Sequence, residues 1–95
     1  MKKYKIVHTN EYRRNFKLMH KQGKNISLLN SIIFQLENGH QLEAKYRDHK
    51  LRNSKKYKDC RECHIENDWL LIYKIENDKL ILTLTNTGSH SDLFE

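Results

Sequence analysis

The chain has 95 residues, of which 37% are hydrophobic and 32% are charged, and its net charge is +6. This length favours one domain spanning residues 1–95 and excludes a large multidomain enzyme. Two cysteines are too few for a disulfide framework. No apolar stretch has the length of a membrane span, and none follows the N-terminus as in a signal peptide. We therefore expect a cytoplasmic protein with no membrane partner.

A short strand and a helix are predicted at the start of the chain. Residues 3–8 alternate weakly between apolar and polar types, which is typical of a strand. Thr9 or Asn10 can cap a helix because their side-chain oxygens accept hydrogen bonds from free backbone N–H groups. Apolar residues then recur at helical spacing until Gly23 ends the run.

A second helix is predicted to follow directly, starting near Asn25 or Ser27 and stopping at Gly39. Its apolar stripe consists of Leu28, Leu29, Ile32, Ile33 and Leu36. Core packing explains such a stripe better than a cofactor contact does. Two amphipathic helices this close together should form a hairpin on one face of a sheet.

The next segment, residues 40–57, lacks clear periodicity and carries the basic excess. Residues 45–58 include one acid, Asp48, and seven bases: Lys45, Arg47, Lys50, Arg52, Lys55, Lys56 and Lys58. The local excess therefore equals the net charge of the whole chain. Such concentration favours a phosphate-binding patch, and a solvated loop is the alternative. With Arg61, these bases form the predicted nucleic-acid-binding set.

Three further strands complete the predicted fold. Residues 60–66 and the continuous apolar run Trp69–Ile75 should form a hairpin around Asn67 and Asp68. Strand alternation places Glu62, His64 and Glu66 on one face, with Cys63 and Ile65 on the other. Residues 79–87 read as the last strand, after a turn at Asn77–Asp78. The order β-α-α-β-β-β predicts an α+β fold: an N-terminal strand and a two-helix hairpin on a four-stranded, mostly antiparallel sheet.

The segment Cys60-Arg61-Glu62-Cys63-His64 matches the C-x-x-C-H pattern of haem attachment. Haem attachment requires an exported chain, which the sequence does not indicate. On a strand, Cys60 and Cys63 point to opposite faces, and this geometry also weakens a zinc site. We therefore predict no cofactor and no metal ligand, and a metal- or haem-binding protein is the weakest alternative.

A second set of titratable residues is spread over strand and loop ends: His49, Glu62, His64, Asp68 and His90. Cleaving RNA without a metal requires a base for the 2′-hydroxyl, an acid for the leaving 5′-oxygen and cations near the phosphorus. Histidine fills either proton-transfer role at neutral pH, because its ordinary pKa is about 6.5. Phe94 can stack on a base or dock on its own core. The remaining histidines, His8, His20 and His40, are assigned to surface or structural positions.

Three stretches carry a family resemblance: Tyr46 to Leu51, Arg61 to Tyr73 and Thr87 to Phe94. They contain the motifs D-H-x-L, H-I-x-x-D-W and G-S-H-x-x-L-F in the right order and spacing. Together they resemble the YafQ branch of the RelE-type bacterial toxins. Residues before 46 agree with that family only in their strand-helix-helix outline.

The resemblance implies a ribosome-dependent mRNA endonuclease that a partner antitoxin, a DinJ/RelB-like ribbon-helix-helix protein, neutralises. It also implies an active site made of His49, His64, Asp68, His90 and Phe94, joined by Glu62 where relatives often carry Asp. In this interpretation His90 is the general acid, His49 the base, and the product a 2′,3′-cyclic phosphate. His64 and Asp68 would orient groups or share the proton work. The alternative is a non-catalytic binder of RNA or the ribosome that the basic segment alone would explain.

Overall fold

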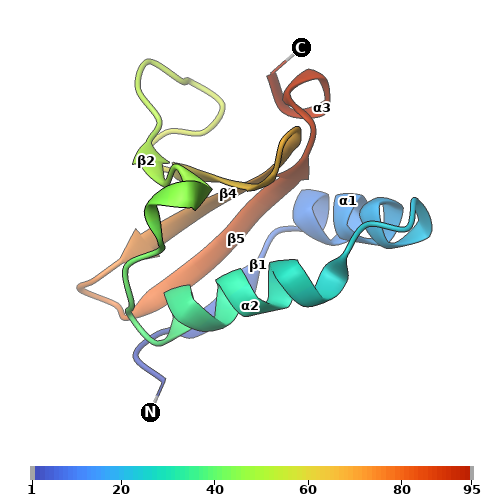
Figure 1. Ribbon diagram of the computed structural model, residues 1–95. Helices are drawn as coiled ribbons and strands as arrows, with labels where there is room; N and C mark the ends of the chain where they lie inside the picture. Colours follow the sequence, from blue (N-terminus) through green and yellow to red (C-terminus); the bar gives the residue numbers. More distant parts are fainter. Residues whose placement is uncertain (1, 95) are drawn as a thin grey trace.

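The computed structural model describes residues 2–94. Its elements in chain order are β1 (Lys5–His8), α1 (Asn10–Lys21), α2 (Ile26–Glu37), the 3-10 helix η1 (Ala44–Tyr46), β2 (His49–Lys50), β3 (Arg61–Glu66), β4 (Trp69–Glu76), β5 (Ile81–Gly88) and α3 (His90–Phe94). The strands form one sheet in the order β1-β5-β4-β3-β2 (Figure 1). Only the β1–β5 pair is parallel in this sheet. The predicted α+β architecture is confirmed.

The predicted signals at the helix ends are also confirmed. Thr9 caps α1, its hydroxyl oxygen accepting the Tyr12 N–H at 2.9 Å. Asn25 caps α2 in the same way, through the Leu28 N–H at 3.4 Å. After α1 and after α2, a glycine (Gly23 and Gly39) turns the chain with the positive φ that favours this residue.

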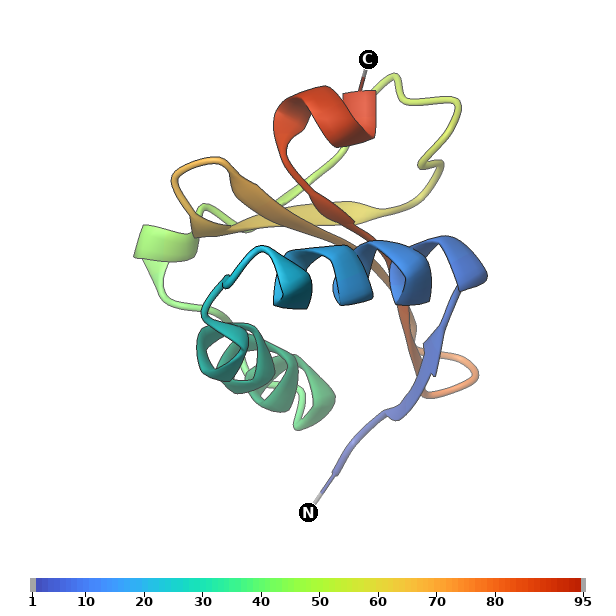
Figure 2. The ribbon, with the colours of Figure 1, turned by 90° about the vertical axis from the view of Figure 1, so that its right-hand side faces the viewer.

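The main core lies between the sheet and the two long helices. Figure 2 shows α1 and α2 on one side of β3 and β4, with α3 on the other. Leu29 and Ile32 from α2 pack with Leu71 from β4 and Leu82 from β5, and all four are almost fully buried. We call this side of the sheet the helix face.

A smaller core fills the opposite side of the sheet, which we call the α3 face. Its members are Tyr57, Cys60, Leu70, Ile72 and Leu93. Cys63 belongs to the core of the helix face. The two cysteines therefore lie on opposite faces, as strand alternation predicted, and both are buried and free.

The sheet differs from the prediction in its number of strands. It has five strands rather than four, because His49 and Lys50 pair with Glu62 and Arg61 as β2. The segment predicted to be irregular thus supplies an edge strand and a 3-10 turn. A strand of two residues carries no periodicity that a sequence could display.

The structure corrects one strand boundary and one prediction of strand alternation. β5 begins at Ile81, because Leu80 has a φ of 54° and belongs with Lys79 to the preceding turn. The pairing of β3 with β4 also shifts register between His64 and Glu66. Glu66 therefore does not share the face of His64, as described below. No helix within residues 2–94 is long and apolar enough to cross a membrane.

Candidate active site

The buried carboxylate of Glu62 lies at the centre of a histidine cluster on the α3 face. Its side chain is 6% exposed, and its Oε1 is 3.5 Å from Nε2 of both His49 and His64. The antiparallel pairing of β2 with β3 sets His49 directly opposite Glu62. His49 Nδ1 is 2.7 Å from the carbonyl oxygen of Arg47, which can only accept, so Nδ1 carries the proton.

A second carboxylate, Asp68, holds the third histidine of the cluster. Asp68 lies in the β3–β4 turn, and its Oδ1 accepts the backbone N–H of His90 at 3.0 Å. The same oxygen is 2.9 Å from His90 Nδ1. Both contacts favour the charged carboxylate and therefore lower the pKa of Asp68. The hydrogen bond from the His90 backbone N–H has the larger effect, and the one from its ring the smaller.

The three imidazole rings form a continuous row. The ring centroids of His49 and His64 are 6.4 Å apart, and those of His64 and His90 are 5.8 Å apart. Phe94 continues the row at 6.2 Å from His90, because both belong to the single turn of α3. Its ring meets Tyr57 edge to face at 5.7 Å and is 44% exposed. The structure thus brings together all six residues predicted for the site.

The predicted nucleic-acid-binding residues fall into separate groups. Lys50, Arg52, Lys55 and Lys58 surround one surface depression in the loop after β2. Lys45 and Arg47 border a different cavity, which His64 also lines. Lys56 is engaged elsewhere, with its Nζ 3.5 Å from Glu11 and 5.3 Å from the Tyr57 ring centroid.

Arg61 lies apart from the histidines, on the helix face with Cys63. Its guanidinium donates Nε–H and Nη2–H to the two oxygens of Asp48, at 3.3 and 3.2 Å. The hydroxyl of Tyr73 donates to the same carboxylate. Hydrogen bonding to Asp48 raises the pKa of Arg61, while burial and then this carboxylate raise that of Tyr73. The charge of Arg61 is therefore paired with Asp48 on the helix face, although its side chain stays 39% exposed.

A polar network that the sequence did not reveal connects β5 with α3 through buried side chains. The side chain of Asn86, at the end of β5, donates to Glu11 and, at 3.0 Å, to the hydroxyl of Tyr57. That hydroxyl donates in turn to the carbonyl of Leu93 at 3.1 Å. The only sequence signal was a polar residue, Asn86, among the alternating residues of a buried strand. The network fixes the helix that carries His90 and Phe94.

The cluster also has the donor set of a transition-metal site. One donor atom from each of Glu62, His64 and His90 lies within 4.8 Å of the other two. Imidazole and carboxylate are common ligands of zinc and copper. The contact of His90 with Asp68 resembles the outer hydrogen bond that orients metal-binding histidines.

Comparison with known proteins identifies the family. Residues 4–95 match the family model described as the bacterial toxin of type II toxin-antitoxin system, YafQ. The mRNA interferase toxin YafQ of Escherichia coli K12 is 39% identical over 90 residues, which cover 94% of each chain.

Solved structures agree with this assignment. The crystal structure of the E. coli DinJ-YafQ complex matches with a TM-score of 0.88 and 34% identity, covering 98% of this chain and 99% of that one. A metal-bound toxin from Helicobacter pylori matches with a TM-score of 0.88 and 35% identity, covering 96% and 99%. The chain therefore belongs to the YafQ family of bacterial type II toxins.

Proposed function

We propose that this chain is an mRNA interferase that cleaves mRNA in the ribosomal A site. The 2′-hydroxyl would attack the adjacent phosphate, leaving a 2′,3′-cyclic phosphate and a free 5′-hydroxyl, without a metal ion. The name of the E. coli relative supports the reaction class. The observation that carries the proposal is the row of three imidazoles, with Glu62 beside His49 and His64 and Asp68 beside His90.

His90 has the surroundings of the general acid. Asp68 accepts its Nδ1–H, which leaves Nε2 to donate a proton to the leaving 5′-oxygen. Asp68 also accepts the backbone N–H of His90, so the position of the ring is fixed through two contacts. Both side chains are exposed, so a substrate reaches them directly.

His49 has the surroundings of the general base. Because Nδ1 donates to a backbone carbonyl, the lone pair of the neutral ring is on Nε2, which lies 3.5 Å from Glu62 Oε1. After Nε2 has taken the 2′-hydroxyl proton, the positive ring would lie beside the Glu62 carboxylate. Glu62 thus stabilises the protonated product of the first transfer. His64 contacts the same carboxylate and bridges the acid and the base.

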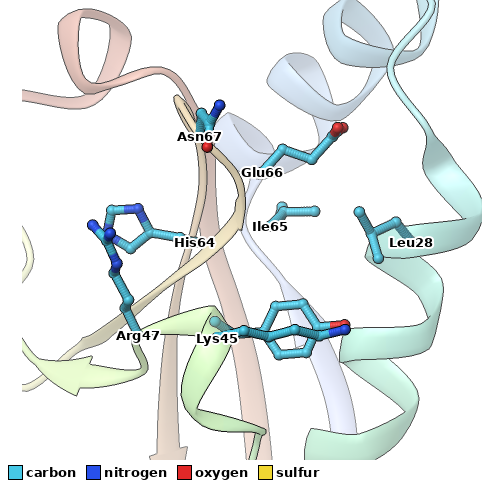
Figure 3. A pocket seen from close by; sticks show the side chains of 8 residues that line it. Leu28, Lys45, Arg47, His64, Ile65, Glu66 and Asn67 are labelled. Atoms are coloured by element: carbon cyan, nitrogen blue, oxygen red, sulfur yellow. The ribbon is translucent and has the colours of Figure 1, made fainter.

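The charge that builds on the phosphate needs a cation. Arg47 is exposed and lies beside His64 (Figure 3), whereas Arg61 is paired on the far face of β3. We therefore assign this role to Arg47. The depression around Lys50 and Lys55 would bind the backbone of the RNA as it approaches the site. Phe94 would stack on a base next to the cleaved bond.

The toxin family supplies the expected partners. The E. coli relative was solved in a complex with DinJ. We infer that a ribbon-helix-helix antitoxin of this kind neutralises the present chain, and that its acidic residues approach the same basic surface as RNA does. mRNA and ribosomes are then the targets, and the cytoplasm is the site of action.

The decisive experiment uses the purified chain with ribosomes carrying a defined message. The proposal predicts cleaved message with a 2′,3′-cyclic phosphate end, in the presence and absence of a chelator. Intact message with blocked translation would instead establish the non-catalytic alternative. Message without ribosomes serves as the matched control, because the proposed cleavage requires the A site.

Metal binding is a second candidate property, favoured by the three donors described above. His64 Nε2 and Glu62 Oε1 are 3.5 Å apart, close to the spacing of two ligands on one tetrahedral zinc ion with bonds of about 2.0–2.2 Å. The H. pylori relative was crystallised as a metal-bound toxin. An ion here would occupy the lone pairs used in proton transfer, so we expect zinc to inhibit cleavage. Titration with Zn²⁺ in the cleavage assay, followed by chelation, tests this.

A further inference from the structure

A cavity of about 270 Å³ lies next to the histidine row, on the opposite side of β3. It lies between α2, η1 and the end of β3, and Figure 3 shows its side chains converging from these three elements. Ile65 from β3 and Leu28 from α2 lie opposite each other in Figure 3, and Tyr46 also lines the cavity. A volume below that of drug-sized sites suits one flat, fragment-sized group.

The acid in this cavity is there because of the bulge in β3. In an unbroken strand Glu66 would share the α3 face with His64. The register shift between these residues turns Glu66 to the other side, where it points toward α2 (Figure 3). Bulges commonly re-aim a side chain beside a functional site. Because of the bulge, His64 contributes to the histidine row and Glu66 lines the cavity on the other side of the strand.

The lining combines the groups that recognise a nucleotide. Two cations, Lys45 and Arg47, outnumber the one acid, Glu66, so the cavity keeps a positive balance suited to phosphate. The Glu66 carboxylate can only accept hydrogen bonds, and a base offers donors at its exocyclic amino group. Leu28, Ile65 and the Tyr46 ring provide apolar and aromatic contacts for the flat faces of a base.

We propose that this cavity binds the base of the nucleotide next to the scissile phosphate and selects bases that carry an amino group over uracil. The inference rests on the proposed mRNA cleavage and adds a source of sequence preference to it. His64 belongs to the row and also lines the cavity, and Arg47 lies beside it, so a strand held at the row has its neighbouring base within reach. An acidic antitoxin segment fits less well, because Glu66 would repel it.

A binding experiment tests the cavity without ribosomes. Adenosine and uridine 5′-monophosphate are titrated into the chain while the methyl resonances of Leu28 and Ile65 are followed by NMR. The proposal predicts shifts at both residues and roughly tenfold tighter binding of the adenosine nucleotide, as expected for one well-formed base contact. Glu66→Ala should remove that difference, and Asp78→Ala, in the distant β4–β5 turn, should keep it. Unmoved methyls, or equal affinities in the unmodified chain, would overturn the proposal.

A cleavage experiment tests the same inference in the proposed reaction. Messages that differ in a single base beside the cut are compared on ribosomes. Glu66→Ala should reduce the preference for amino-bearing bases by about tenfold relative to the Asp78→Ala control. A preference unchanged by Glu66→Ala would overturn the base pocket and leave mRNA cleavage standing. Absence of cleavage by the unmodified chain would instead refute the proposed function. The nucleotide titration would still test whether the cavity binds a base.

Discussion

The two faces of the sheet use the same strand for opposite purposes. On the helix face, Cys63 and Ile65 of β3 are buried under α1 and α2. On the α3 face, Glu62 and His64 alternate with them and meet histidines from β2 and α3. Because strand residues alternate in direction, one short segment supplies both a core layer and a proposed catalytic layer.

The treatment of charge differs in the same way between the faces. Arg61 and Asp48 neutralise each other on the helix face, and the Tyr73 hydroxyl completes the set. On the α3 face, His49 and His90 remain exposed beside their carboxylates. The helix face therefore pairs its charges within the fold, while the α3 face keeps its histidines accessible on the same rigid strand. This arrangement gives the precision that proton transfer needs.

The largest expected effect is on the α3 face. His90→Ala should lower the rate of mRNA cleavage by about 10²–10⁴-fold, the usual contribution of a general acid. Growth arrest on expression should be lost, while antitoxin binding, measured by titration calorimetry, should persist. The control is His40→Ala, an exposed histidine away from the row that contacts Gln35. Unchanged toxicity of a stably folded His90→Ala protein would refute the role of this residue.

An aromatic residue on each face separates stability from activity. Trp69 is 1% exposed on the helix face, and its indole N–H donates to Thr87 at 3.0 Å. Trp69→Ala should therefore reduce the free energy of unfolding by about 3–5 kcal/mol. Phe94→Ala loses mainly an edge-to-face contact and should cost about 1 kcal/mol while impairing cleavage. Urea denaturation of both variants checks this, and equal losses of stability would contradict the division between the faces.

The partly buried ion pair of Arg61 and Asp48 gives a smaller effect on stability. Asp48→Asn leaves the Arg61 charge without its bidentate partner, in a site where Asp48 is 18% exposed. We expect a loss of about 1–2 kcal/mol in the free energy of unfolding, because solvent still reaches the pair. The matched control, Glu43→Gln, breaks an exposed pair with Lys45 and should change stability very little. A large drop in cleavage at unchanged stability would place Asp48 in the site rather than in the fold.

The parts of the fold that sequence patterns predicted are those with local causes. Thr9 and Asn25 cap helices through side chains that bond within three residues. The opposite burial of Cys60 and Cys63 follows from their odd spacing along an extended chain. In the same way, the motif residues were expected to meet because adjacent strands and a tight turn carry them.

The parts that patterns missed depend on pairing between distant segments. β2 exists only because His49 and Lys50 hydrogen-bond with β3, so no periodicity marks it. The bulge that turns Glu66 away from His64 is a property of the β3–β4 register rather than of any residue type. The charge of Arg61 alone predicts a place among the RNA-binding bases. Its direction and its partner Asp48 became visible only in three dimensions.

The smallest expected effect concerns the pH dependence of stability on the α3 face. The His90 backbone and ring lower the pKa of Asp68 below its ordinary value in the folded state. A group with a lowered folded pKa stabilises the fold above its unfolded pKa, which for Asp is about 3.9, and loses this contribution as pH falls through the folded value. The melting temperature of Asp68→Asn should therefore lie slightly below that of the unmodified chain at pH 7. The gap should close as the pH is lowered through the acidic range, and because the Asp68 side chain is exposed, added salt should shrink it as well. A gap that is constant with pH would mean that the carboxylate charge does not hold α3 in place. The row would then depend on the buried Asn86 and Tyr57 contacts alone.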